Sequence, residues 1–406
     1  MPPDPGQRRS RVVLIAAICV FSTQFGVTVI APLLGTWVAA SSTPFLVAAL
    51  IFSAFTLAST PLTIPGGILS DRVGRKPLII AGLVLFAIAS LLFPFATEPH
   101  DWIVIRAVQG AGAGLFFPAV TALLAEVTTH AERGQAMSGY NIGLGLGLAV
   151  GPVSGGVLFD RYGIFEPFLV CTALALCSAA LVFLFLEEPK QREQPSDERL
   201  QLSGEDRKAL TLACSMIFFG IGVAAIMGAL FSPYVSAPAG LKLSASYIGA
   251  LLSTLFMVFA VLQLLLNRVM TLVGDANLAR AGLVLCACGL VVLSFATRPG
   301  ELVLMSVLLG AGLGAVSLGT LTMASRAASE SEGERAEERV RHGKVMGIYY
   351  TAFYAGLGGI PLVCGALSEV FGAQTLFLAY ALLLLVVMLF VWRLAGRSPE
   401  RSAPAK

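Results

Sequence analysis

Long apolar runs alternate with short polar stretches along the whole chain. Twelve runs are about 20 residues long, the length that a helix needs to cross a bilayer, and each holds at most one charged residue. They are too long for strands, and their side chains do not alternate in polarity. The pattern predicts twelve transmembrane helices with both chain ends on one side of the membrane. These predicted spans are residues 12–34, 45–69, 77–97, 102–125, 136–159, 165–186, 209–232, 246–267, 278–296, 301–325, 345–367 and 374–392.

Basic residues are spread unevenly over the polar stretches. If both ends lie in the cytoplasm, 23 of the 27 Lys and Arg residues fall in cytoplasmic segments, and only Arg161, Lys242 and Arg298 fall in outer loops. Cytoplasmic loops of membrane proteins carry an excess of Lys and Arg. The distribution therefore predicts that both termini are cytoplasmic. The remaining basic residue, Arg106, lies inside the fourth span.

The widest polar gap divides the spans into six and six. It predicts an N-terminal six-helix bundle over residues 1–186, a cytoplasmic linker over residues 187–208, and a C-terminal six-helix bundle with a cytoplasmic tail over residues 209–406. A second charged stretch, residues 326–344, separates spans ten and eleven. We expect it to be a solvated loop, with a short surface helix as the alternative.

Composition narrows the class of protein further. The 406 residues are 56% hydrophobic and 13% charged, whereas soluble domains carry about 25% charged residues. This excludes an ordinary soluble enzyme, a disordered chain and a disulfide scaffold. A net charge of +3 is too small to indicate nucleic-acid binding. The seven cysteines lie in apolar runs without a CxxC pair, and the three histidines lie elsewhere, so no metal site and no cofactor are expected.

The chain also contains internal repeats. The sequence GGILSDRVG of residues 66–74 returns as GGVLFDRYG in residues 155–163, three spans later and on the opposite side of the membrane. Such a reversal is typical of the inverted three-helix repeats of transporters. A weaker echo, residues 365–372, ends span eleven. The halves repeat as well, because the glycines of residues 110–114 return in residues 310–314.

The stretch GILSDRVGRK between spans two and three resembles the loop signature of the major facilitator superfamily. The residues that carry the match are Gly67, Asp71, Arg72, Gly74, Arg75 and Lys76. Positive-inside anchoring with a tight glycine turn is the plainer interpretation. The resemblance implies instead a conformational latch between the bundles. In it, Arg75 pairs with Glu126 at the inner end of span four, and Asp71 meets the start of span eleven near Lys344 and Val345, where a helix N-terminus attracts anions.

Arg106, Gln109 and Gly110 in span four resemble a second motif of the superfamily, R-x-x-Q-G. A lone arginine in a span costs about 2.5–3.5 kcal/mol on insertion scales. Snorkelling to the outer interface past Trp102 is one way to lower that cost. The resemblance implies the alternative, in which Arg106 faces the bundle interior against span one and couples substrate or proton to conformation. Ser306 stands at its place in the second half.

Span five resembles a motif found mainly in the exporters of the superfamily, the drug/proton antiporters. Its residues are Gly147, Gly151, Pro152, Gly155 and Gly156. The spacing predicts a smooth helix face that packs closely on a neighbour, and Pro152 predicts a bend. Close packing alone would also explain the glycines. The family has a further glycine nine positions before Gly147, where this chain has Ser138.

None of the 24 acidic residues lies in the middle of a span. Many proton antiporters of the family carry a carboxylate in span one, where this chain has Gln24. A cavity with Arg106 and no carboxylate favours neutral or anionic amphiphiles. Polar and aromatic residues of the spans are candidates for the lining of an apolar pocket, although each could be an ordinary helix contact: Gln24, Thr56, Tyr140, Asn141, Phe218, Met227, Gln263 and Tyr354.

These features together predict an all-α polytopic membrane protein with two six-helix bundles, inverted three-helix repeats and the major facilitator fold. We expect a monomeric secondary active transporter, not an enzyme, that exports small amphiphilic compounds across the cell membrane by alternating access. No GxxxxGK[ST] phosphate loop occurs, so the proton gradient is the expected energy source. A facilitator or symporter for a nutrient such as a sugar or organic acid is the alternative. A non-transporting sensor or scaffold is a remote one.

Overall fold

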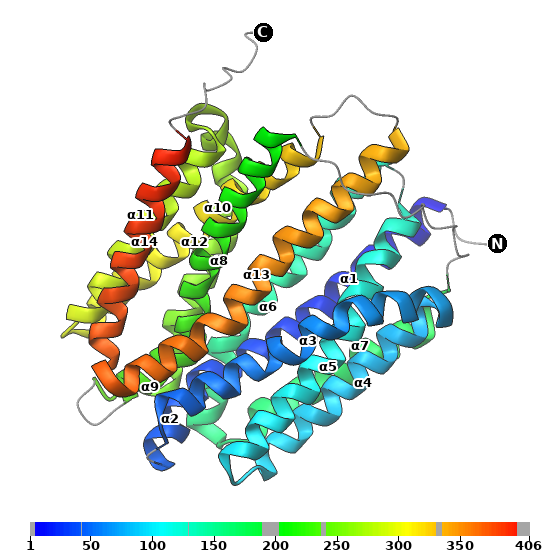
Figure 1. Cartoon of the computed structure of the whole chain (residues 1–406). Helices are drawn as coiled ribbons and strands as arrows, with labels where there is room; N and C mark the ends of the chain where they lie inside the picture. The colour runs from blue at the N-terminus through cyan, green and yellow to red at the C-terminus, as the bar shows by residue number, and fades with distance from the viewer. Residues whose placement is uncertain are drawn as a thin grey trace.

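The computed structural model describes residues 5–41, 43–128, 130–188, 203–236, 241–329 and 335–395. These residues are almost entirely helical and include no strand (Figure 1). Twelve helices are long and apolar enough to cross a membrane, so the predicted all-α polytopic fold is confirmed. The elements are α1 Pro5–Thr28, α2 Ile30–Ser41, α3 Phe45–Val73, α4 Arg75–Leu92, η1 Phe93–Phe95, α5 Pro99–Val127, α6 His130–Tyr162, α7 Phe165–Phe185, α8 Gly204–Ile226, η2 Met227–Phe231, α9 Ser232–Ser236, α10 Ala245–Val273, α11 Asp275–Phe295, α12 Pro299–Ser329, α13 Arg335–Phe371 and α14 Ala373–Ala395.

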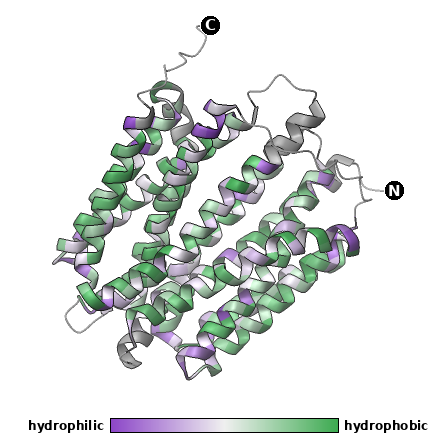
Figure 2. Ribbon diagram, viewed as in Figure 1, coloured by the Kyte–Doolittle hydropathy of each residue, from purple (hydrophilic) through white to green (hydrophobic). Residues whose placement is uncertain are grey.

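Nine spans correspond to one long α-helix each, and the third is α4 with the short 3-10 turn η1 at its end, whereas the first and the seventh are interrupted. Span one consists of α1 and α2, separated at Val29, and span seven runs from α8 through the π-helical turn η2 into α9. Hydrophobic residues cover the length of most helices and hydrophilic residues gather at their ends (Figure 2). This distribution is what a lipid-facing bundle requires. We call the side on which span one begins the inner side; it is the side predicted to be cytoplasmic.

Two of the predicted connections between spans are long polar stretches, residues 187–208 and 326–344. The linker predicted over residues 187–208 lies mostly outside the described residues, and α8 begins at Gly204, five residues before the predicted span. The prediction of a solvated loop over residues 326–344 was wrong for most of that stretch. Helix α12 continues to Ser329 and α13 already begins at Arg335. Intrahelical hydrogen bonds satisfy the backbone there, and α13 therefore extends span eleven at its inner end into one 37-residue helix.

A glycine with a positive φ angle ends the second helix of every three-helix repeat. Gly74 (φ +108°), Gly163 (+98°), Gly274 (+84°) and Gly372 (+80°) lie between spans two and three, five and six, eight and nine, and eleven and twelve. Each donates its backbone N–H to the carbonyl four residues earlier, at 2.9–3.1 Å. Only glycine adopts this backbone conformation cheaply. The sequence shows three copies of this repeat, which end at Gly74, Gly163 and Gly372. The structure adds a fourth copy, which ends at Gly274.

The halves share a second structural feature at an offset of 200 residues. A Cβ atom added to Gly82 would lie 2.6 Å from the carbonyl oxygen of Gly112, and one added to Gly282 would lie 2.6 Å from that of Gly312. Helices α4 and α5, and likewise α11 and α12, therefore pack backbone against backbone. Small residues permit such close approach in the absence of a hydrophobic driving force between membrane helices. The glycine echo of the sequence reflects this packing.

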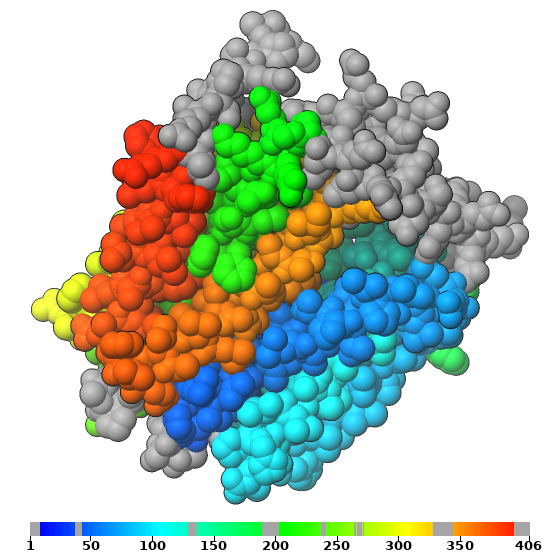
Figure 3. Space-filling view, in the orientation of Figure 1, coloured from blue at the N-terminus to red at the C-terminus, as the bar shows by residue number. Residues whose placement is uncertain are grey.

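Hydrogen bonds between the two halves cluster at the outer side. Hydrogen bonds join α2 to α9, α3 to α13, and α6 to α10, and all of these lie in the outer halves of the spans. Figure 3 shows α3 and α13 in contact at the lower left and diverging toward the upper right, where deeper atoms come into view. The structure is therefore closed at its outer side.

Candidate functional site

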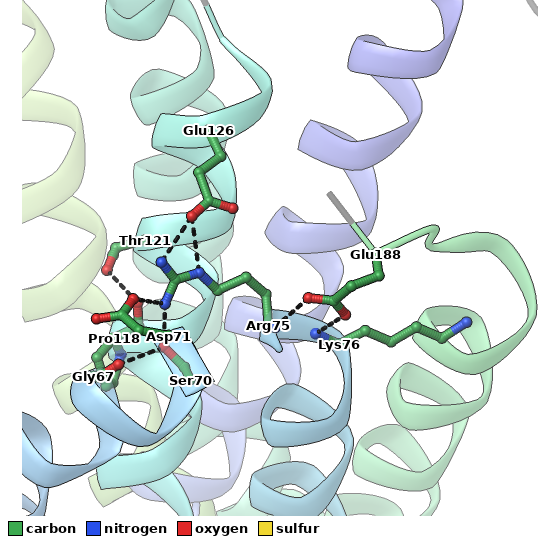
Figure 4. Close-up of polar contacts among 9 residues, drawn as sticks. All are labelled: Gly67, Ser70, Asp71, Arg75, Lys76, Pro118, Thr121, Glu126 and Glu188. Carbon is green, nitrogen blue, oxygen red and sulfur yellow. Dashed lines mark hydrogen bonds and ion pairs between the residues drawn. The ribbon is translucent and has the colours of Figure 1, made fainter. Parts of the chain in front are cut away.

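Arg75 is the centre of a charged cluster at the inner ends of α3, α4 and α5 (Figure 4). Its Nε and Nη2 atoms donate to Glu126 Oε1 at 3.0 and 2.7 Å, and its Nη1 lies 2.5 Å from Asp71 Oδ1. Nη1 also donates to Ser70 Oγ. The side chains of Arg75 and Glu126 are 12% and 15% exposed. The Arg75–Glu126 pair implied by the family resemblance is present, and the cluster ties three helices into one unit.

Glu188, which sequence reasoning missed, binds the N-terminus of α4. Its carboxylate accepts the backbone N–H groups of Arg75 and Lys76 at 2.5 and 2.9 Å. The first N–H groups of a helix have no intrahelical partner and attract anions. The positive φ angle of Gly74 favours glycine, and an added Cβ, 2.8 Å from Glu188 Oε1, would displace this carboxylate from the helix terminus. Lys76 Nζ in turn donates to the carbonyl of Phe183 at 2.8 Å, which attaches the end of α7 to the same loop.

The helix N-terminus that Asp71 was expected to meet near Lys344 and Val345 is not at that place. Helix α13 begins at Arg335, so Lys344 and Val345 lie inside a helix and offer no N-terminal N–H groups. The prediction of a helix terminus at this place was wrong. Asp71 pairs with Arg75 in its own half of the protein. Arg72 is exposed. A Cβ added to Gly67 would lie 3.9 Å from Pro118 Cβ of α5, an ordinary van der Waals contact that does not require glycine.

The C-terminal half repeats the inner ion pair with reversed charges. Asp275 at the start of α11 accepts from Arg326 near the end of α12, with 3.1 Å between Oδ2 and Nη1. These two positions are those of Arg75 and Glu126 shifted by 200 residues. The sequence contains this relation, but a repeat search that matches identical residues overlooks a pair whose charges are exchanged.

Arg106 is buried in the N-terminal half, with 1% of its surface exposed. Its Nη1 donates to Gln109 Oε1 at 3.1 Å and approaches the carbonyl of Val27 in α1 at 3.5 Å. Its guanidinium carbon lies 4.9 Å from the ring centre of Phe55, and its Nε has no hydrogen-bond partner among the described residues. Gln109 donates onward to Ser90 Oγ at 2.8 Å. Arg106 therefore faces span one in the interior and does not snorkel.

Gly110 follows Arg106 by one turn and explains how α5 approaches α3. A Cβ on Gly110 would lie 2.1 Å from the carbonyl oxygen of Phe55. This is far inside van der Waals contact, so the backbones meet directly at this level. The close approach brings the ring of Phe55 over the guanidinium of Arg106.

One face of α6 carries glycines that pack on α1. Added Cβ atoms on Gly147 and Gly155 would lie 2.6 Å from the carbonyl oxygens of Phe21 and Val29, and one on Gly151 would lie 2.7 Å from that of Phe25. The contacts repeat every four residues on both helices, as the small-xxx-small spacing requires. The exporter-like motif is therefore a continuous helix interface within the N-terminal half.

The opposite face of α6 meets α10 of the other half. A Cβ on Gly156 would lie 2.2 Å from the carbonyl oxygen of Ala245, and one on Gly249 would lie 2.2 Å from that of Pro152. Beside Pro152, the backbone N–H of Val153 donates to Ser253 Oγ across the interface at 2.9 Å. A proline disturbs the helical hydrogen-bond ladder, and here a serine of the partner half contacts the helix next to it.

The predicted cavity residues do not all share one environment. Tyr350 and Tyr354 of α13 lie with their ring centres 6.5 Å apart and their planes tilted by 33°. Tyr140 lies on α6 of the other half. Met227 is fully buried in η2, Thr56 is buried at 3%, and Asn141 is exposed. Half-buried positions are held by Gln24, Phe218 and Gln263.

Comparison with known proteins identifies the family. The model of the Major Facilitator Superfamily matches residues 16–225 and again residues 212–406. The chain belongs to the Major Facilitator Superfamily. This transporter is 23% identical to an uncharacterized MFS-type transporter of Methanocaldococcus jannaschii over 92% of its own length and 96% of that protein.

Two further relatives of this transporter bear the name of multidrug resistance proteins. It is 25% identical to MdtG of Enterobacter lignolyticus, with 88% of this chain and 84% of the relative covered. It is 35% identical to multidrug resistance protein 2 of Bacillus subtilis over 139 residues, 34% of each chain. Among solved structures, a bacterial homologue of the lysosomal transporter Spinster in an inward-facing, unoccupied conformation has a TM-score of 0.78 at 15% identity, with both chains fully covered. The protein is thus a membrane transporter and not an enzyme.

Proposed function

We propose that this transporter exports small amphiphilic, drug-like compounds across the cell membrane and that the proton gradient drives the export. The observation that carries the proposal is the double interface of α6. One face packs on α1 through Gly147, Gly151 and Gly155, and the other packs on α10 through Gly156. This is the helix whose motif resembles that of the exporters, and the relatives named as multidrug resistance proteins support the same direction.

The mechanism that we infer is alternating access by movement of one half against the other. The cluster of Asp71, Arg75 and Glu126 holds α3, α4 and α5 together, so the N-terminal half can tilt as a unit. The closely packed interface of α6 and α10 at the outer side would have to open for release. We infer that Asp71, Arg75 and Glu126 also contribute to closing the inner side once the outer side has opened.

The substrates that fit best are neutral or anionic and carry an aromatic ring. Tyr140, Tyr350 and Tyr354 offer ring faces from both halves, and aromatic pairs contribute about 0.5–1.5 kcal/mol beyond the area they bury. Arg106 supplies a buried positive charge without a carboxylate beside it in its recorded contacts. A cationic drug would find no counter-charge in the middle of the spans.

The same lack of a mid-span carboxylate supports the second candidate, a nutrient facilitator or symporter. One experiment separates the two. Accumulation of fluorescent dyes and labelled drugs is measured in cells that lack their major efflux pumps, with the protein, with Arg106→Ala and without the protein, and a protonophore is added midway. If the protein is an exporter, cells that contain it should accumulate less of the compound, and the protonophore should restore the accumulation. Cells with Arg106→Ala should accumulate as much as cells without the protein. Unchanged or raised accumulation across neutral, anionic and cationic compounds would reject export.

A further inference from the structure

Two carboxylates at the outer side reach from one half of the protein to a helix N-terminus of the other. Asp160, at the end of α6, accepts the backbone N–H of Ser246 at 2.7 Å and its hydroxyl at 2.5 Å. Glu369, at the end of α13, accepts the backbone N–H of Leu46 at 3.2 Å. Ser246 and Leu46 are each the second residue of their helix, α10 and α3. Both contacts therefore satisfy an N–H group that the helix itself leaves unpaired.

The two contacts are related by the internal symmetry of the fold. Ser246 and Leu46 are 200 residues apart, the same offset that relates the halves elsewhere. Asp160 and Glu369 each stand three residues before a glycine with a positive φ angle, Gly163 and Gly372. They are therefore equivalent positions of the repeat, and each half supplies one acid and receives the other.

The equivalent positions at the inner side do not carry a symmetric pair of acids. Asp71 stands three residues before Gly74 and pairs with Arg75. Three residues before Gly274 the sequence has Thr271, which carries no charge. Both equivalent positions therefore hold an acid at the outer side only, and there the two acids make symmetric contacts between the halves.

We propose that Asp160 and Glu369 form an outer latch that holds the transporter in the outer-closed conformation. A carboxylate at a helix N-terminus interacts favourably with the unpaired N–H groups and the helix dipole. Opening the outer side separates α6 from α10 and α13 from α3, so both interactions must break together. Because both acids are exposed, water replaces them and the barrier stays small enough for turnover. The proposal concerns the conformational equilibrium and does not depend on the identity of the substrate.

Local helix capping is the competing explanation, and the chain provides a matched control for it. Asp101 accepts the backbone N–H groups of Thr97 and Glu98 at 3.2 and 3.1 Å, entirely within the N-terminal half. Glu301 makes the same contacts in the C-terminal half. All four carboxylates cap helices at the outer side, but only Asp160 and Glu369 cap a helix of the other half. Removal of Asp101 or Glu301 should therefore leave the equilibrium between the halves unchanged.

The test measures the distance between the outer ends of the two halves by pulsed electron paramagnetic resonance in nanodiscs. Spin labels are placed at His100→Cys and Gly300→Cys. The side chain of His100 is 76% exposed, and a Cβ at Gly300 meets nothing within 4 Å. The exposed or half-buried native cysteines are replaced by alanine in all samples: Cys177, Cys214 and Cys288.

Asp160→Ala and Glu369→Ala should each raise the ratio of long to short outer distances by about fivefold, the effect expected from the loss of an N-cap. Asp160→Asn keeps an acceptor oxygen, so its ratio of long to short distances should lie between that of Asp160→Ala and that of the parent protein. Asp101→Ala and Glu301→Ala should not change the ratio. An unchanged ratio in both latch variants, or an equal shift in the two controls, would overturn the proposal. If Asp160→Ala fails to fold, Asp160→Asn and Glu369→Ala still decide it.

Discussion

Replacement of Arg106 by methionine should separate the stability of this transporter from its activity. Methionine keeps most of the side-chain volume and removes the charge. The loss of the hydrogen bonds to Gln109 and to the carbonyl of Val27 costs about 1 kcal/mol each. The loss of the contact with the ring of Phe55, 4.9 Å from the guanidinium carbon, costs about 1 kcal/mol.

The opposing term is the burial of the charge itself. A guanidinium in the middle of a span costs about 2.5–3.5 kcal/mol on insertion scales, and Arg106 is 1% exposed with an unpartnered Nε. The gain from removing the charge therefore offsets the losses to within about 1 kcal/mol. We expect Arg106→Met to shift the melting temperature in nanodiscs by less than about 3 °C, while net transport falls at least tenfold.

Two measurements on the same preparation check this reasoning. Thermal unfolding gives the stability. Transport of a labelled compound across the membrane of liposomes with an imposed pH gradient gives the activity. A loss of stability above about 2 kcal/mol would mean that Arg106 serves the fold. Full transport by a stable Arg106→Met protein would refute a coupling role. Arg106→Lys is the informative companion, because it keeps the charge but not the planar donor geometry.

Two further predictions concern packing and the inner ion pair. Gly110→Ala should destabilise the fold by about 1–3 kcal/mol, because its Cβ would lie 2.1 Å from a backbone carbonyl oxygen. Gly359→Ala, with nothing within 4 Å of the added Cβ, should stabilise the fold by about 0.5–1 kcal/mol. Equal melting temperatures of the two variants would contradict this prediction. Exchange of the charges by Arg75→Asp with Glu126→Arg should lower stability while Asp71 remains beside the new acid, and stability should return when Asp71→Thr is added, as in the C-terminal half. Failure of the triple variant to recover, measured by thermal unfolding, would show that the two pairs are not equivalent.

Much of the membrane architecture could be read from local sequence because the physical requirement is local. Each span must contain about 20 apolar residues whatever its neighbours are, and the number of spans follows from counting them. The glycine at the end of each repeat is also a local requirement, since the chain must adopt a positive φ angle there. The limits of this approach appeared at α13, where polar side chains on a helix outside the membrane look like a loop in a hydropathy pattern.

The side-chain contacts of the candidate site followed less directly from sequence. The partner of Arg75 was inferred from a family resemblance, and the capping of α4 by Glu188 was missed because the acid lies 113 residues away, in the polar stretch that follows α7. Arg106 illustrates the same limit. Its sequence position near the outer interface was compatible with snorkelling, and only the packing of α1, α3 and α5 around it places it in the interior.

Short segments of the chain are enough to predict a twelve-span membrane protein built from inverted repeats, because span length and repeated glycines are local properties. Which of the equivalent repeat positions interact between the halves follows from the packing of distant helices. Asp160 and Ser246 are 86 residues apart in the chain, and Glu369 and Leu46 are 323 apart. An acid that precedes a glycine reads the same at either side of the membrane. Its partner depends on which side of the molecule is closed, and that is set by the packing of the two halves.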